Sequence, residues 1–181
     1  ESLPIFLKEI NKLNCKKLIV LQKEDIQTKN AISENENIEI LIQKNNGYGN
    51  ALIEGINASK TEYCCIINAD GSMNPSYLAD MLLKCENQDF VFASRYLSPG
   101  GGSDDDTFIT IIGNKIFSFL GNLLFNLNLS DILFTYIVGK TKSFKILNLK
   151  YADFRLCIEI PIKAKKQNLK YISIASYERS R

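Results

Sequence analysis

The chain has 181 residues and a formal net charge of +2, so it is long enough for one domain with a hydrophobic core. This small, scattered charge argues against a nucleic-acid-binding surface. The absence of histidine excludes a histidine general base, a histidine metal site and a Ser-His-Asp triad within the chain. Any catalysis must therefore come from carboxylates, lysine, arginine, tyrosine or a bound metal.

The five cysteines indicate a reducing compartment. Their number is odd, no Cys-x-x-Cys spacing occurs, and Cys64 and Cys65 lie inside an apolar run. This usage is typical of reduced thiols in the core of a cytoplasmic protein rather than of disulfides or a metal site.

Helix and strand patterns alternate in the first part of the chain. Ser2 suits the N-cap of a helix whose apolar stripe runs over residues 5–13. We expect strands at Lys17–Leu21 and Ile38–Ile42, with a short helix and a polar loop over Thr28–Glu36 between them.

A turn containing Gly47 and Gly49 follows, and apolar residues at helical spacing then continue from Asn50 to Ser59. Such a turn before a helix can cradle a phosphate through its backbone N–H groups and the helix dipole. The same residues suit a tight strand-to-helix turn without a ligand, and Gly-x-Gly alone does not separate the two.

The apolar run Tyr63–Ile67 predicts a buried parallel strand. It ends in the polar sequence Asn68-Ala69-Asp70-Gly71-Ser72, which Pro75 follows. Because ligands bind at the carboxyl ends of the strands in open α/β sheets, Asp70 is the first candidate site residue. A plain turn is the alternative for this Asp-Gly pair.

A second buried strand is expected at Phe90–Ser94, after a helix over Pro75–Leu83. If this strand is parallel to the one before Asp70, it delivers Arg95 and Tyr96 to the same edge of the sheet. The run Asp104-Asp105-Asp106 then predicts an acidic loop, with a divalent-cation site as the alternative.

The segment Phe108–Leu129 is strongly apolar. Its longest uncharged run, Ile116–Leu129, is shorter than the roughly 20 residues that a membrane span needs. Polar residues at every fourth position define one stripe along a helix; they are Asn114, Ser118, Asn122 and Asn126. Both a core helix and a helix lying at a membrane interface fit this pattern.

The last part of the chain predicts strands at Ile137–Lys140 and Tyr171–Ser176. A helix start is expected at Lys142–Leu147 and an amphipathic helix over Phe154–Lys166. Pro161 lies inside the second helix and is expected to kink or split it.

Three of these motifs resemble inverting family 2 glycosyltransferases, in particular the branch that loads a hexose onto polyprenyl or dolichyl phosphate. They are Gly47-Tyr48-Gly49-Asn50-Ala51, the Asn68–Ser72 segment before Pro75, and Ser94-Arg95-Tyr96. The resemblance implies a three-layer α/β/α GT-A fold with a mostly parallel central sheet, as a single domain over residues 1–181. Family members carry an apolar strand before the segment that Glu1-Ser2-Leu3-Pro4 resembles, so we expect a fragment without the first strand and shortened at its C-terminus.

The resemblance also implies a UDP- or GDP-linked sugar as donor and Mg²⁺ or Mn²⁺ as cofactor. Asp70 would hold the cation, with Asn68 and Ser72 as neutral oxygen partners. Asn68 stands where the family carries its first acidic residue. The nucleotide-binding residues that the resemblance implies are Asp25, Gly47, Gly49, Asn68 and Asp70.

The implied acceptor is polyprenyl phosphate in cell-envelope glycan synthesis, at the cytoplasmic face of a membrane, with a glycan as the alternative. Arg95 would bind a phosphate, or form a structural salt bridge instead. A phosphate acceptor is already ionised and needs no strong base. A sugar hydroxyl needs a carboxylate base, for which Asp131 is the first candidate.

Two other functions stay open. A sugar-nucleotide-binding or regulatory module without catalysis fits the amide at Asn68 and the unmatched segment Gln22–Asp25. A sugar nucleotidyltransferase shares the general fold, but it would need a Gly-rich loop with a basic residue after a first strand, a region that this sequence does not contain.

Overall fold

Buried apolar runs form the centre of the molecule, and each strand expected from the sequence is present. The computed structural model describes residues 3–32 and 38–180. The expected N-cap Ser2 and the end of the expected polar loop lie outside the described residues. The helices are α1 (Leu3–Ile10), α2 (Ile26–Ile32), α3 (Tyr48–Ala58), the 3₁₀ helix η1 (Pro75–Tyr77), α4 (Leu78–Cys85), α5 (Phe108–Phe125), α6 (Thr141–Ile146) and α7 (Leu156–Lys166). The strands are β1 (Lys17–Leu21), β2 (Ile38–Ile42), β3 (Tyr63–Ile66), β4 (Phe90–Ser94), β5 (Gly102–Ser103), β6 (Ile137–Lys140), β7 (Tyr171–Ala175) and β8 (Tyr177–Glu178).

The largest sheet has the strand order β3-β6-β4-β7. Strand β6 is antiparallel to both of its neighbours, so β3 and β4 run parallel to each other, and β7 is parallel to β4. This confirms that the chain leaves β3 and β4 at the same edge. Strands β1 and β2 form a separate parallel pair, and within the described residues no ladder joins β1 to β3.

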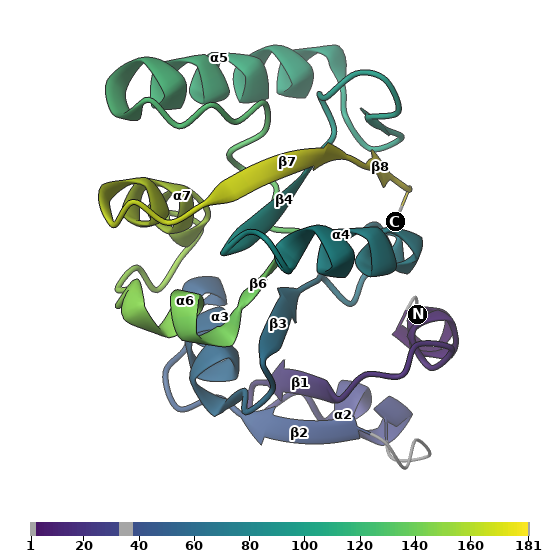
Figure 1. Cartoon of the computed structure of the whole chain (residues 1–181). Coiled ribbons are helices and arrows are strands. Elements are labelled where there is room, and N and C mark those ends of the chain that lie inside the picture. Colours follow the sequence, from purple (N-terminus) through teal and green to yellow (C-terminus); the bar gives the residue numbers. More distant parts are fainter. Residues whose placement is uncertain (1–2, 33–37, 181) are drawn as a thin grey trace.

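Two hydrophobic clusters cover the two faces of this sheet, because successive side chains of a strand point to opposite faces. Phe90 and Phe92 pack with α6 and α7 on one face, whereas Val91 and Ala93 pack with α4 on the other. Figure 1 shows the resulting layers, with the strands between α4 and the α6–α7 side. The expected three-layer α/β/α fold is confirmed.

Helix α7 is not split at Pro161, although a split was one of the two outcomes expected there. It begins at Leu156 and continues past Pro161 to Lys166 without being split. Proline removes one backbone hydrogen bond from a helix interior. Here its ring is buried together with Ile160 and Ala164, and this packing offsets the lost bond.

The cysteines are free thiols, as their number and spacing predict. Cys85 and Cys157 are buried, and Cys64 and Cys65 are partly buried, whereas Cys15 is exposed. Burial raises the pKa of the Cys85 and Cys157 thiols to about 11, so both are neutral at physiological pH. The expectation of core thiols therefore fails only at Cys15.

Candidate active site

The turn after β3 places Asp70 at the edge of the sheet with its side chain held in one orientation. Gly71 adopts φ +85°, a conformation that favours glycine, and turns the chain back toward Ser72. One Asp70 oxygen, Oδ1, accepts hydrogen bonds from the Ser72 backbone N–H at 3.1 Å and from the Ser72 hydroxyl at 2.8 Å. Asp70 itself is partly exposed, so the carboxylate combines a fixed position with access to solvent.

Ser72 differs from its expected role as a metal ligand. The residue is only 1% exposed, and its hydroxyl donates to Asp70. Ser72 therefore orients the carboxylate rather than facing a ligand itself. Within residues 3–32 and 38–180, no group of three or more His, Cys, Asp or Glu side chains has the arrangement of a metal site.

Asn68 joins this turn to the turn before α3. Its amide oxygen lies 3.4 Å from the Tyr48 hydroxyl, which also lies 2.6 Å from the hydroxyl of Thr135. The Tyr48 ring stacks on Phe154 with a centroid separation of 4.6 Å. Burial raises the pKa of Tyr48 to about 12, so its hydroxyl stays protonated. The sequence marks Tyr48 as an aromatic residue between two glycines, but no local pattern identifies Thr135 as the partner of its hydroxyl.

The Gly47–Gly49 turn has the features of a structural turn, one of the two alternatives that the sequence left open, and a nucleotide contact of Gly47 or Gly49 stays a prediction. The Gly49 N–H donates to the carbonyl oxygen of Ala152 at 2.8 Å. A Cβ atom on Gly49 would lie 2.1 Å from the carbonyl oxygen of Tyr151, so only glycine allows this approach. Gly47 adopts φ +121°, and a Cβ atom on it would collide with the same Ala152 carbonyl. Both glycines therefore serve the packing of α3 against residues 151–153.

Asp25 lies just after β1, at the carboxyl end of that strand. Its side chain accepts a hydrogen bond from the Gln22 backbone N–H at 3.0 Å, and its carbonyl accepts from Lys29 in the first turn of α2. The carboxylate is exposed. A contact between Asp25 and a nucleotide stays a prediction.

Arg95 follows β4 and is enclosed by carboxylates. Its Nε donates to Asp131 Oδ2 at 2.8 Å and its Nη2 to Asp131 Oδ1 at 3.1 Å, a bidentate pair. Its Nη1 lies 3.1 Å from Glu178 and 3.6 Å from Asp106, and the guanidinium also lies over the ring of Phe134. Burial opposes the charge, but the bonds to Asp131 outweigh it and raise the pKa of Arg95.

This cluster contradicts two sequence-based roles. The Arg95 side chain is 10% exposed and each of its three nitrogens already donates to a carboxylate, so the structural salt bridge fits better than a phosphate contact. The Asp131 side chain is fully buried and both of its oxygens accept from Arg95. A general base must reach the proton that it removes, and Asp131 has no such access. Glu178, which the sequence did not single out, completes the cluster from β8.

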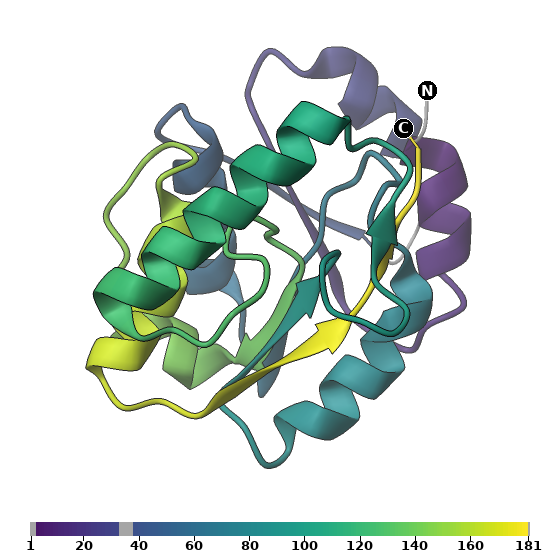
Figure 2. The same ribbon diagram turned by 90° about the horizontal axis from the view of Figure 1, so that it is seen from above.

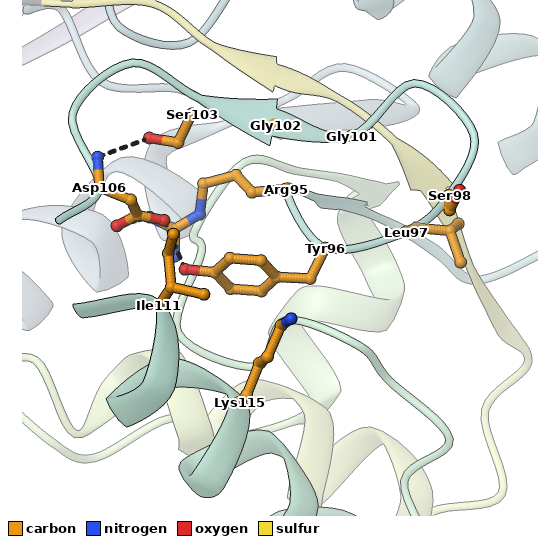
Figure 3. A pocket seen from close by; sticks show the side chains of 10 residues that line it. All are labelled: Arg95, Tyr96, Leu97, Ser98, Gly101, Gly102, Ser103, Asp106, Ile111 and Lys115. Carbon is orange, nitrogen blue, oxygen red and sulfur yellow. Dashed lines mark hydrogen bonds and ion pairs between the residues drawn. The ribbon is translucent and has the colours of Figure 1, made fainter. Parts of the chain in front are cut away.

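A cavity of about 240 Å³ lies beside the cluster, between the loop 97–106 and the first half of α5. Figure 3 shows Tyr96 at its centre and Lys115 reaching toward it from α5. The Tyr96 hydroxyl donates to Asp106 and accepts from the Asn114 amide at 2.8 Å. Asp104 accepts from the Tyr177 hydroxyl at 2.6 Å, so side-chain contacts hold the acidic loop to the edge.

Comparisons with known proteins agree with this architecture. A family model described as Glycosyl transferase family 2 matches residues 21–147. Glucosyl-3-phosphoglycerate synthase from Mycobacterium tuberculosis in complex with phosphoglyceric acid superposes with a TM-score of 0.71 at 11% identity, covering 99% of this chain and 67% of that chain. The same enzyme in complex with Mn²⁺, uridine-diphosphate and glucosyl-3-phosphoglycerate gives a TM-score of 0.70 at 12% identity, with 99% and 67% covered.

A third similar structure is 4-diphosphocytidyl-2C-methyl-D-erythritol synthase from Anaerococcus prevotii DSM 20548. Its TM-score is 0.63 at 12% identity, and the match covers 97% of this chain and 77% of that chain. A comparison with curated protein sequences found no match. The chain spans about two thirds of the length of the mycobacterial structures. At these identities the structural likeness shows the fold.

Proposed function

The chain belongs to glycosyl transferase family 2, and from this premise we propose that it transfers a hexose from a UDP- or GDP-linked sugar to polyprenyl phosphate at a membrane surface. The observation that carries the proposal is the position of Asp70. This carboxylate lies on the turn after β3, at the edge where the parallel strand β4 also ends, and Ser72 fixes its orientation. Sheet edges of this kind are where α/β proteins bind nucleotides.

Asp70 fits a role in holding Mg²⁺ or Mn²⁺. These ions need one or two carboxylates when substrate phosphates supply further oxygens, and Asp70 offers one that is partly exposed. The bound ion would act as a Lewis acid that stabilises negative charge on a departing diphosphate. Asn68 could add a neutral oxygen, although that oxygen already accepts from Tyr48. The solved structure with Mn²⁺ and uridine-diphosphate supports this assignment by its shared fold.

A phosphate acceptor agrees with the residues at the edge. A phosphate is ionised at neutral pH and attacks without a base, whereas a sugar hydroxyl needs a base that neither histidine nor the buried Asp131 can provide. Lys115 lines the cavity and is exposed, so it is the residue that we assign to the acceptor phosphate in place of Arg95. Lysine is well suited to binding phosphate as a point charge.

Calorimetry tests the donor side of the proposal. UDP-glucose and GDP-mannose are titrated into the protein with and without Mn²⁺, and one of them should bind only with the metal. Asp70→Ala should abolish this binding. Asp80→Ala is the matched control, because Asp80 is an exposed carboxylate paired with Lys84 on α4. Unchanged metal-dependent binding by Asp70→Ala would refute the assignment, and transfer of label to polyprenyl phosphate tests the acceptor.

A binding module without catalysis is the second candidate, and the amide at Asn68 favours it. The amide bonds to Tyr48 and carries no charge for a cation. Sugar-nucleotide binding that is equally tight without Mn²⁺, and that leaves no transfer to any phosphate acceptor, would support this module instead.

A further inference from the structure

Helix α5 presents its apolar side chains to the outside of the molecule. It is capped by the Thr107 side chain, ends at the left-handed Asn126 and has 18 residues, of which only Ser118 and Gly121 are buried. Among its large apolar side chains Ile109 is 81% exposed, Phe108 76% and Leu124 69%. Figure 1 shows α5 as an outermost element, and Figure 2 looks down onto it. Within the described residues, α5 is the one helix long and apolar enough to cross a membrane, and 11% of it is buried.

Most of the exposed apolar residues of α5 lie on one side of the helix. At about 100° per residue, nine exposed large apolar side chains fall within an arc of about 180°. They are Phe108, Ile109, Ile112, Ile116, Phe117, Phe119, Leu120, Leu123 and Leu124. A helix on the surface of a water-soluble domain has the opposite arrangement, with the apolar stripe turned toward the core.

One stripe of polar and small residues on α5 faces the protein instead, and it consists of Asn114, Ser118, Gly121 and Asn122. Ser118 accepts from the Ile132 N–H at 3.3 Å, and Asn122 exchanges two hydrogen bonds with the backbone of Leu129. A Cβ atom on Gly121 would lie 2.8 Å from the side chain of Ile132, so the helix packs closely along this stripe. Asn114 holds the helix to Tyr96. These contacts fix which side of α5 faces outward.

We propose that α5 lies in the plane of a lipid bilayer interface, with its apolar arc in the acyl region and its polar stripe on the protein. The arc exposes apolar area on the order of 1,000 Å², about twice the largest patch of an ordinary monomer. Residues 107–130 contain no acidic side chain, and the charged residue of the helix, Lys115, lies beside the edge of the arc. Lysine at such a boundary places its ammonium among headgroups.

The width of the arc favours lipid over a second copy of the chain. A partner helix covers a stripe of about 100°, and both ends of this arc, at Phe108 and Phe117, would stay in water. A bilayer covers the whole half-cylinder. A membrane-spanning orientation is disfavoured, because it would pull Ser118 and Asn122 away from their partners at Ile132 and Leu129.

This placement has a consequence for the acceptor, which rests on the proposed function. The first half of α5 lines the cavity beside Tyr96, so the cavity would open at the level of the headgroups. A phosphate carried by a lipid would then meet Lys115 without leaving the membrane. The membrane contact itself follows from the arc alone.

Tryptophan fluorescence tests the contact, since the chain contains no tryptophan. Phe119→Trp places a reporter in the arc, and Leu83→Trp on α4 is the matched control, because Phe119 is 63% exposed and Leu83 62%. With phosphatidylcholine vesicles, emission from Phe119→Trp should shift to the blue and be quenched by brominated lipid, whereas the control should not respond. Absence of the shift, or a shift in buffer that accompanies a doubling of the sedimenting mass, overturns the proposal.

Flotation with the same vesicles gives an independent measurement. The pair Leu123→Asp with Leu124→Asp should reduce the floated fraction at least tenfold, whereas Leu82→Asp with Leu83→Asp, an exposed adjacent pair on α4, should leave it unchanged. Equal flotation of both pairs contradicts the placement. Transfer to a short-chain, water-soluble prenyl phosphate should survive the α5 substitutions. If the unsubstituted protein shows no transfer to the short-chain prenyl phosphate, the proposed function is refuted, whereas the membrane contact is not.

Discussion

A single substitution at the contact between Asp131 and Arg95 tests whether Asp131 has a structural or a catalytic role. Asp131→Asn keeps the shape of the side chain and removes its charge. The Asp131 side chain is fully buried and accepts two bonds from Arg95 together with the Arg95 backbone N–H at 3.2 Å. The substitution should therefore destabilise the fold without removing a group that touches the substrate.

The magnitude follows from what remains around the guanidinium. Breaking a buried ion pair costs about 3–5 kcal/mol when it leaves the partner charge uncompensated. Here Glu178 at 3.1 Å and Asp106 at 3.6 Å still face Arg95, and removing one of three carboxylates also relieves repulsion among them. We therefore expect a loss at or below the lower end of that range, about 2–3 kcal/mol in the free energy of unfolding.

Urea unfolding measures this loss, and a sugar-transfer assay under conditions where the variant stays folded measures activity. Asp80→Asn is the control, because its side chain is 51% exposed and an exposed i,i+4 pair contributes about 0.3–0.5 kcal/mol. Unchanged stability together with loss of transfer would make Asp131 a base and refute the structural account of the cluster.

Two further predictions concern the support of α3 and the loop beside it. Gly49→Ala should lower the free energy of unfolding by more than about 2 kcal/mol, since its Cβ would lie 2.1 Å from the Tyr151 carbonyl. Gly113→Ala, in an open helical position, should raise it by about 0.5–1 kcal/mol in the same urea unfolding assay. Burial opposes ionisation of Glu159, but Lys163 and two backbone N–H groups outweigh it and lower the pKa of Glu159 below 4.5. Its contribution to stability is therefore present above that pH and lost as the pH falls through the folded pKa, so Glu159→Gln should flatten the acid side of a stability–pH profile; an unchanged profile contradicts the assignment.

The strands were predictable because their signal is local. Lys17–Leu21, Ile38–Ile42, Phe90–Ser94 and Ile137–Lys140 are observed with the predicted bounds, since each is an apolar run between polar residues. The sequence predicted a shared edge for Asp70 and Arg95 on the condition that their strands are parallel, and the structure shows that β3 and β4 are parallel. The direction of a strand relative to its neighbours is a property of the sheet, and it cannot be predicted from a run of apolar residues.

The side-chain partners at the edge were not predictable, because they are distant in the sequence. Glu178 reaches Arg95 across 83 positions from a two-residue strand that no periodicity marks. The Gly49 N–H donates to the carbonyl of Ala152, which lies in the loop between α6 and α7. A local pattern shows that arginine or glycine is present, whereas the surrounding fold decides what occupies its donors. The nucleotide contact of Asp25 stays a prediction.

Helix α5 shows why the orientation of an amphipathic helix needs more than its period. Asn114, Ser118 and Asn122 form the polar stripe that their spacing predicts, whereas Asn126, the fourth predicted member, is the left-handed C-cap that ends the helix. The usual rule would then turn this stripe to water and bury the apolar side. The rule assumes that water surrounds the domain. The outward apolar side of α5 departs from the rule in water but is favourable if the medium next to the helix is apolar. Because the backbone N–H of Ile132 and the backbone of Leu129 bond to this stripe, the fold itself requires the reversed orientation, and the bilayer contact is the condition under which that orientation is stable.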